Sequence, residues 1–354
     1  MTIFKSGAPG VEWSPGDPDA TVPLHPTDAE SNQPDAYATY PSVCPACEGE
    51  LGIDAYCLQC GQKAKSLREH FEATPAPWVG AVCDIGLTHA RNEDALACLA
   101  DDHRAVLVVC DGVTTSDDSD IASLAAARTA CDLLWANDPQ GTGLLSSRTA
   151  AVNALLTDAI RSANAAVVDQ SSPTSTNSPA STIAIAVIDS EAVFCANLGD
   201  SRVYWIPDSG EPTQLTKDHS LAQDGIDSGA LRADAESSVF AHTITKWLGR
   251  DAVDIDPYLA SMPIESAGWI IVCSDGLWNY ASEASAIKEL ITALEEPTPH
   301  TLATWLVTWA NEQGGHDNIT VACARVIVDQ GPSPSEPETP LSDEQEPTQD
   351  PTTD

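Results

Sequence analysis

The stretch that decides the fold is Ala105–Ser116, which reads AVLVVCDGVTTS. Its first six residues are continuously apolar and rich in β-branched side chains, and this pattern predicts a strand that is covered on both faces. Asp111 follows directly, and a carboxylate at the end of a buried strand is costly unless something binds it. Gly112 lets the backbone come close to that partner. We therefore expect a ligand at the end of this strand.

Two other apolar runs end in the same way. The run Trp269–Cys273 leads to Asp275, which is followed by a glycine, and the run Ala192–Leu198 leads to Asp200. A single Asp-Gly pair is more often only a turn. Three apolar strands that each deliver an aspartate indicate something more, namely carboxylates gathered at one edge of a sheet. This arrangement suits a hard cation.

Asp317 belongs to the same set, because it lies just before the last apolar run, 319–328. An all-oxygen cluster of Asp111, Asp275 and Asp317 favours Mg²⁺ or Mn²⁺ over zinc. If Asp111 bridged two such ions, they would lie about 3.5–4 Å apart and would activate water for in-line attack on phosphorus.

The formal charge of the 354-residue chain is −37, from 53 acidic and 16 basic residues. Residues 1–40 hold six acids and one base, and residues 330–354 hold seven acids and no base, so most of the charge lies between them. Such a field repels nucleic acid and anionic membranes, and it favours cations and basic peptide segments. Simple solubility or a salt-adapted proteome would explain the charge equally well.

The sequence predicts a cytoplasmic protein. No apolar run approaches the roughly 20 residues of a membrane span, and the first ten residues contain no apolar signal-peptide core. Seven of the 11 cysteines are scattered through apolar segments, which is typical of reduced, buried thiols.

The other four cysteines form a compact motif. Cys44 and Cys47 make one CxxC pair, and Cys57 and Cys60 make a second pair, with nine residues between the two pairs. Two such turns can place four thiolates around one structural Zn²⁺, and a segment this small has no core on which to fold otherwise. Two local disulfides or a redox pair are the alternative, which the reducing compartment and the doubled motif disfavour.

Composition and periodicity divide the chain into five parts. They are an acidic, Pro-rich tail (1–41), a zinc-ribbon-like module with a short helix (42–72), a linker (73–78), the main domain (79–329) and a second acidic tail (330–354). Both tails are predicted to be disordered. The short helix is predicted from Lys63 onward, because Leu67 and Phe71 have i, i+4 spacing.

The main domain combines many short apolar runs with helical stripes at 118–135 and 148–168 and two further stripes after residue 284. Strands and helices do not alternate strictly, so two antiparallel sheets flanked by helix pairs fit better than one doubly wound sheet. The predicted class is therefore α+β, a two-sheet β-sandwich. The polar stretch 207–245, hereafter the flap, is long enough to indicate a functional loop beside the site.

Seven segments of the main domain together resemble the metal-dependent Ser/Thr protein phosphatases of the 2C type (the PPM family), in their bacterial form. They are DIG…ARNEDA (84–95), VVCDG (108–112), STIAIAVI (181–188), ANLGDSRVYW (196–205), LTKDHSL (215–221), IIVCSDGLW (270–278) and GGHDNITV (314–321). They follow the family's order and span residues 79–328. The family's fold, a β-sandwich flanked by helix pairs, agrees with the periodicity.

The resemblance implies a ligand set. Asp111 would bridge two catalytic Mn²⁺ or Mg²⁺ ions, Gly112 would offer its carbonyl to one of them, and Asp275 and Asp317 would complete the other.

It also implies supporting roles. Glu93 and Asp94 would hold water molecules around the ions, Asp200 with Asp275 would match a third, weaker metal position near the flap, and Asn318 would orient Asp317.

Two positions depart from the family. Where many members have an arginine that grips the phosphate, this chain has His89, which can donate a hydrogen bond or, when protonated, act as a cation. Arg91 is a neighbouring alternative. Where animal members have a histidine after the Asp-Gly pair, this chain has Val113. The leaving group would then take its proton from water held by the ions or from His89, or its protonation would be weak.

The sequence thus predicts a monomeric enzyme that hydrolyses phosphoserine and phosphothreonine in proteins, in signalling opposite a Ser/Thr kinase, with Asp111, Asp275, Asp317 and His89 as catalytic residues. Two alternatives stay open: a non-catalytic phosphatase-like module that docks partners through the zinc segment and tails, and a metal-dependent hydrolase of small phosphate esters.

Overall fold

The computed structural model describes residues 41, 43–172 and 174–328 of the chain. The two acidic tails, which are predicted to be disordered, lie outside the described residues, apart from residue 41. Within the described ranges, no helix is both long enough and apolar enough to cross a membrane.

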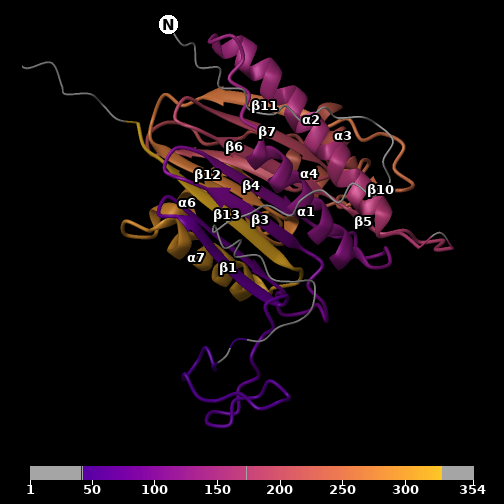
Figure 1. Cartoon of the computed structure of the whole chain (residues 1–354), viewed down its shortest axis with the longest axis vertical. Helices are drawn as coiled ribbons and strands as arrows, with labels where there is room; N and C mark the ends of the chain where they lie inside the picture. The colour runs from indigo at the N-terminus through magenta and orange to yellow at the C-terminus, as the bar shows by residue number, and fades with distance from the viewer. Residues whose placement is uncertain (1–40, 42, 173, 329–354) are drawn as a thin grey trace, which may run out of the picture. The chain divides into compact units, whose positions relative to one another are not determined.

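Two antiparallel sheets pack face to face at the centre of the main domain (Figure 1). The six-stranded sheet has the order β1-β2-β13-β12-β8-β9, the five-stranded sheet has the order β11-β7-β6-β4-β3, and β5 and β10 form a separate pair. The strands are β1 (His70–Ala76), β2 (Val79–Asp84), β3 (Ala95–Ala100), β4 (Ala105–Cys110), β5 (Ala180–Ser181), β6 (Ile183–Ile188), β7 (Ala192–Leu198), β8 (Arg202–Pro207), β9 (Thr213–Gln214), β10 (Leu248–Gly249), β11 (Tyr258–Pro263), β12 (Gly268–Cys273) and β13 (Ile319–Val326). The predicted α+β sandwich is confirmed.

Helices cover the outer faces of both sheets. The helices are α1 (Ser119–Ala136), α2 (Leu145–Asp169), α3 (Leu221–Asp227), α4 (Arg232–Glu236), α5 (Asp275–Trp278), α6 (Ala284–Thr292) and α7 (Pro299–Gln313). Helices α1 and α2 share an apolar cluster with the five-stranded sheet, and α6 and α7 share one with the six-stranded sheet. The two predicted helix pairs are therefore present.

Strand register gathers the aspartates at one edge of the sandwich. Cys273, the last residue of β12, lies opposite Val321 near the start of β13 and opposite Arg202 at the start of β8. Because neighbouring strands run antiparallel, the segment after β12 and the segments before β13 and β8 meet at the same edge. In the other sheet, Cys110 at the end of β4 lies opposite Ala95 at the start of β3.

The predicted helix from Lys63 to residue 72 and the predicted linker 73–78 are wrong. Residues 70–76 form the edge strand β1, which pairs with β2 and places Phe71 against the core between the sheets. One i, i+4 pair is too short a signal to outweigh a strand partner. Pro75 lies where the register of β1 shifts, as expected for a proline on an edge strand.

Three further details differ from local sequence signals. The flap contains the short helices α3 and α4 and is not wholly irregular. Strand β11 lies at an edge of its sheet and is partly exposed, and it has no continuous apolar run from which a strand could be predicted. Asp118 precedes α1 with φ 49° and its side chain makes no capping hydrogen bond, and the hydroxyl of Ser119 donates to Glu93.

Candidate metal centre

Carboxylates from both sheets face one another at the edge where β4 and β12 end. Burial raises the pKa of Asp111 well above its usual range, and the charges of Asp94, Asp275 and Asp317 raise it further. Carboxylates that repel one another in a poorly hydrated place stay ionised only beside a compensating positive charge. The structure thus brings Asp111, Asp275 and Asp317 together, while their roles as ligands stay predictions.

The backbone around Asp111 is held tightly. Its N–H donates to Thr182 Oγ1 at 3.1 Å, and its carbonyl accepts from the N–H of Thr182 at 2.8 Å. A Cβ atom on Gly112 would lie 2.7 Å from the carbonyl oxygens of both Glu93 and Ser119. Only glycine fits this close approach of the end of β4 to the loop of Glu93 and to the start of α1.

Asp94 is almost completely buried and accepts hydrogen bonds of 2.7 Å from the hydroxyls of Ser274 and Thr320. Burial raises its pKa to about 7, helped by the charges of Asp317 and Asp275, and the two hydroxyls only partly oppose this rise. These hydroxyls orient Asp94 without contributing charge. The sequence did not single them out, because both lie within or beside apolar strands.

Glu93 is also buried, and its Oε1 accepts from Arg91 Nη2 at 2.6 Å and from the hydroxyl of Ser119. Burial opposes ionisation of Glu93, but these hydrogen bonds outweigh it and the pKa is lowered. Arg91 also lies 3.4 Å from Asp120. The guanidinium of Arg91 is therefore directed at carboxylates, although 47% of its side chain is exposed.

His89 lies on the other side of the centre, with Nε2 3.3 Å from Asp317 Oδ1. Burial raises the pKa of Asp317 to about 6, and the charge of Asp275 adds to the effect. The imidazole thus lies beside a carboxylate of the centre, and its role as a phosphate ligand stays a prediction.

Asn318 ties the loops of the centre together. Its N–H donates to Asp317 Oδ1 at 2.8 Å, and its Oδ1 accepts from the N–H of Glu93 at 2.7 Å. Its Nδ2 donates to the carbonyls of Ile85 and Arg91 at 2.9 and 3.2 Å. Asn318 therefore contacts Asp317 through its backbone N–H, and its side chain makes hydrogen bonds to the backbone of Glu93, Ile85 and Arg91.

Asp275 has a buried oxygen, Oδ1, with no hydrogen-bond partner among the described residues. Such an oxygen needs a cation or a water molecule to satisfy it. Ligand atoms of Asp200, Asp275 and His242 all lie within 4.8 Å of one another. The donor set therefore fits divalent cations. His242 was not predicted from the sequence, where its only signal is its place in the long polar flap.

A family model described as "Protein phosphatase 2C" matches residues 88–310, which is more than half of the chain. The chain belongs to this family. Its resemblance to the 2C-type phosphatases, read from seven motifs, is confirmed.

Relatives of this 2C-type chain include the "Serine/threonine phosphatase stp" of Listeria innocua, which is 29% identical over 242 residues and matches 67% of this chain and 91% of the relative. A crystal structure of the serine/threonine phosphatase PstP/Ppp of Mycobacterium tuberculosis is 28% identical, with a TM-score of 0.55, and covers 70% of this chain and 98% of that one. A structure of the catalytic domain of PstP in complex with two manganese ions has a TM-score of 0.52 at 25% identity and covers 70% of this chain and 97% of that one.

The four clustered cysteines of this 2C-type chain lie outside the residues that the family model matches. The Sγ atoms of Cys44 and Cys60 are 3.7 Å apart, those of Cys47 and Cys57 are 3.5 Å apart, and all four lie within 4.8 Å of one another. Disulfide sulfurs lie about 2 Å apart, so these thiols are unbridged. Four sulfurs placed tetrahedrally at about 2.3 Å from one zinc ion would be separated by nearly the distances seen here.

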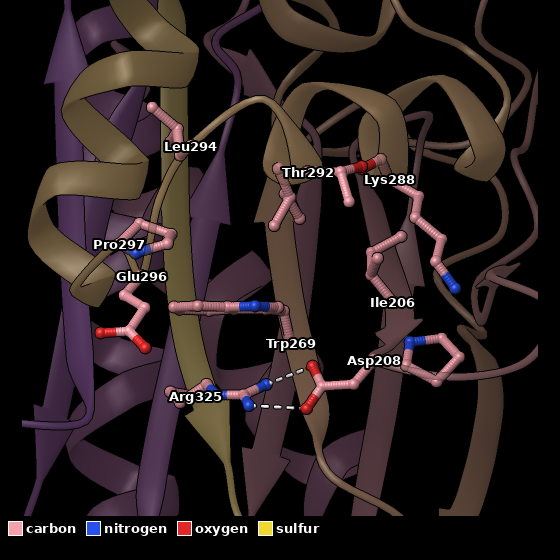
Figure 2. Close-up of a pocket in the computed structure, with 11 residues that line it drawn as sticks. Ile206, Asp208, Trp269, Lys288, Thr292, Leu294, Glu296, Pro297 and Arg325 are labelled. Atoms are coloured by element: carbon pink, nitrogen blue, oxygen red, sulfur yellow. Dashed lines mark hydrogen bonds and ion pairs between the residues drawn. The ribbon is translucent and has the colours of Figure 1, made fainter.

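A pocket of ≈ 460 Å³ lies elsewhere in the 2C domain, at the start of β12 and under α6 (Figure 2). Arg325 makes two hydrogen bonds of 2.7 Å to Asp208, and its guanidinium lies 5.1 Å from the ring centre of Trp269. Lys288 donates to the carbonyl of Gly210 at 2.7 Å. Both cationic side chains of this pocket are therefore paired within the protein. The candidate metal centre lies at the other end of β12.

Proposed function

We propose that this chain is a protein serine/threonine phosphatase that hydrolyses phosphoserine and phosphothreonine at two Mn²⁺ or Mg²⁺ ions. The ligands would be Asp111, the carbonyl of Gly112, Asp275 and Asp317. The observation that carries the proposal is the position of Asp111, a carboxylate whose pKa is raised by burial and by four neighbouring carboxylates. An all-oxygen set of this kind selects hard divalent ions, and PstP binds manganese.

When bound, such ions lower the pKa of the attacking water and stabilise charge on the phosphoryl oxygens. The chain contributes orientation. Asn318 and the hydroxyls of Ser274 and Thr320 hold Asp317 and Asp94 in place. Preorganised groups of this kind need not reorganise during the reaction.

His89 is the proposed phosphate ligand of the chain itself. Its imidazole would donate a hydrogen bond to a phosphoryl oxygen. Because Val113 cannot donate a proton, the leaving oxygen would take one from His89 or from water held by the ions. Arg91 would assist if it released Glu93. The substrates would be phosphorylated proteins, in a pathway with a Ser/Thr kinase.

The activity is tested with the purified full-length chain, Mn²⁺ and a phosphothreonine peptide. We expect turnover that an Asp111→Asn or Asp275→Asn variant loses by roughly 100-fold or more. Asp102→Asn, an exposed aspartate in the turn between β3 and β4, is the matched control and should keep the wild-type rate. Turnover no higher than that of Asp275→Asn would refute the proposal. Faster turnover of nucleotides than of phosphopeptides would point to small phosphate esters.

We also propose that Cys44, Cys47, Cys57 and Cys60 hold one structural Zn²⁺. Hydrogen bonds from the N–H groups of Cys60 and Gln59 lower the pKa of Cys57 to about 6, which favours a thiolate at neutral pH.

Elemental analysis of protein purified without chelator tests this site. One zinc per chain is expected in the wild type and in Cys98→Ala, a variant of a buried thiol in β3, and no zinc is expected in Cys57→Ala. Wild-type protein without zinc would end the proposal.

A further inference from the structure

His242 brings the flap to the metal edge. It lies within a turn in which the N–H of Thr243 donates to the carbonyl of Phe240 at 3.0 Å, and the N–H of Leu221 donates to the carbonyl of Thr243 at 2.9 Å. The imidazole stacks on the indole of Trp278, with ring centres 5.8 Å apart and planes inclined by 25°. The ring is therefore held in place although it is exposed to solvent.

The imidazole is aimed at two carboxylates of the core. Nδ1 of His242 lies 4.0 Å from Asp275 Oδ2, and one ligand atom each of Asp200, His242 and Asp275 lies within 4.8 Å of the others. Two atoms bound to one ion at about 2.1 Å each can be up to about 4.2 Å apart. The 4.0 Å between His242 and Asp275 lies within this limit and is too long for a direct hydrogen bond.

Both carboxylates have few hydrogen-bond donors among the described side chains. Asp275 Oδ1 is buried and has no partner in the described part of the chain. Asp200 is only 5% exposed, and no described side chain donates a hydrogen bond to it. A buried carboxylate oxygen without a donor needs a cation or a water molecule to satisfy it. The unpaired Oδ1 of Asp275 is an observation independent of the histidine.

We propose that His242 is a nitrogen ligand of a third divalent ion, shared with Asp200 and Asp275, and that this ion fastens the flap to the core. The inference deepens the proposed function, since the resemblance implied only the two aspartates at this position. A nitrogen donor makes the site prefer Mn²⁺ over Mg²⁺, because imidazole favours transition ions. The flap is then held by metal-independent contacts, among them those of Arg202 with Asp218 and Glu236, and by a metal-dependent contact at His242.

The test counts bound Mn²⁺ by electron paramagnetic resonance during titration of the zinc-loaded, full-length chain at neutral pH. We expect two tighter ions and one weaker ion in the wild type. His242→Gln should weaken the third ion roughly 10-fold or more, a change typical of lost metal-site contacts, and should leave the tighter two within about twofold. His316→Gln, which alters another histidine of the same pocket, is the matched control and should keep all three ions.

Tryptic cleavage within and just after the flap, at Arg232, Lys246 and Arg250, gives a second measurement. Saturating Mn²⁺ should slow cleavage of the wild type several-fold, and should slow that of His242→Gln much less. Equal ion counts in the two proteins would overturn the proposal. So would a loss of protection in His242→Gln that is the same without Mn²⁺, because that result would indicate a direct ion pair with Asp275.

Neither measurement depends on turnover. If the chain failed to hydrolyse phosphopeptides but lost its third ion in His242→Gln, the proposed function would fail and this inference would stand. If turnover were normal and the ion counts of the two proteins were identical, the proposed function would stand and this inference would fail.

Discussion

At the scale of single residues, the metal edge depends on small and neutral side chains as much as on its carboxylates. Ser274 and Thr320 donate to Asp94, and Asn318 holds the loops around Asp317. Gly112 lets the strand end touch the loop of Glu93. Each of these contacts places a carboxylate without adding charge, so the set of negative groups stays available to cations.

We predict that Gly112→Ala lowers phosphatase activity by about 10-fold or more and destabilises the fold by about 1–3 kcal/mol, because the added methyl group would meet backbone oxygens that cannot move independently. Urea unfolding and phosphopeptide turnover measure the two effects. Gly225→Ala in α3 is the control, since its nearest neighbours would lie 3.7 Å away and alanine favours a helix. Equal behaviour of the two variants would contradict the prediction.

At the scale of elements, the flap is attached to β8 by a buried arginine. Arg202 makes hydrogen bonds of 2.7–3.0 Å to both oxygens of Asp218, and its guanidinium lies 3.7 Å from the ring centre of Trp278. It also reaches Glu236 of α4 at 3.1 Å. A pair with both partners this deeply buried holds the flap in one position, because either charge alone would be unpaired in the core.

We predict that Arg202→Met destabilises the protein by about 3–5 kcal/mol, since it leaves Asp218 buried without its cation. Joining it with Asp218→Leu should recover most of this loss. Arg325→Met breaks the more exposed pair with Asp208 (Figure 2) and should cost no more than about 1 kcal/mol. Denaturant unfolding compares the three proteins, and a similar cost for both arginines would show that the flap is not anchored this way.

At the scale of the whole molecule, the acidic chain places its most strongly perturbed carboxylates in one place. The pKa of Asp94 is raised to about 7 and that of Asp317 to about 6 by burial first and by neighbouring carboxylates second. Without divalent ions, the folded chain keeps protons that the unfolded chain releases above about pH 4. Folding and cation binding are therefore linked at this edge.

We predict that the metal-free chain becomes less stable as the pH rises from 5 to 8. The folded state binds more protons than the unfolded state in this window, so the free energy of unfolding falls by about 1.4 kcal/mol per pH unit for each retained proton. Saturating Mn²⁺ should remove the decline, because it binds the ionised folded form. Thermal unfolding at pH 5 and pH 8, with and without Mn²⁺, measures this.

Asp94→Asn is the control for the pH dependence. It removes one titrating group and should make the metal-free decline shallower, while other groups such as His70 contribute equally to both proteins. An unchanged slope, or a metal-free chain that is more stable at pH 8 than at pH 5, would contradict the assignment.

The sequence by itself determined the strands that carry the aspartates and the kind of site they make. Ala105–Cys110 and Trp269–Cys273 are apolar on both faces, so they could only be buried strands, and the aspartates after them had to lie at strand ends. The two CxxC pairs could also be recognised from the sequence, because each CxxC turn is local. These features depend on residues that are close together in the chain, and the hydrophobic pattern of the sequence indicates them directly.

Only the tertiary structure decided which distant residues meet. It turned residues 70–76 into a strand through pairing with β2, brought Ser274 and Thr320 to Asp94, and set His242 of the flap beside Asp275. Each of these contacts joins residues far apart in the chain, and strand register and sheet packing select the partners. No local pattern encodes such a choice, because it depends on burial that exists only once both sheets are assembled.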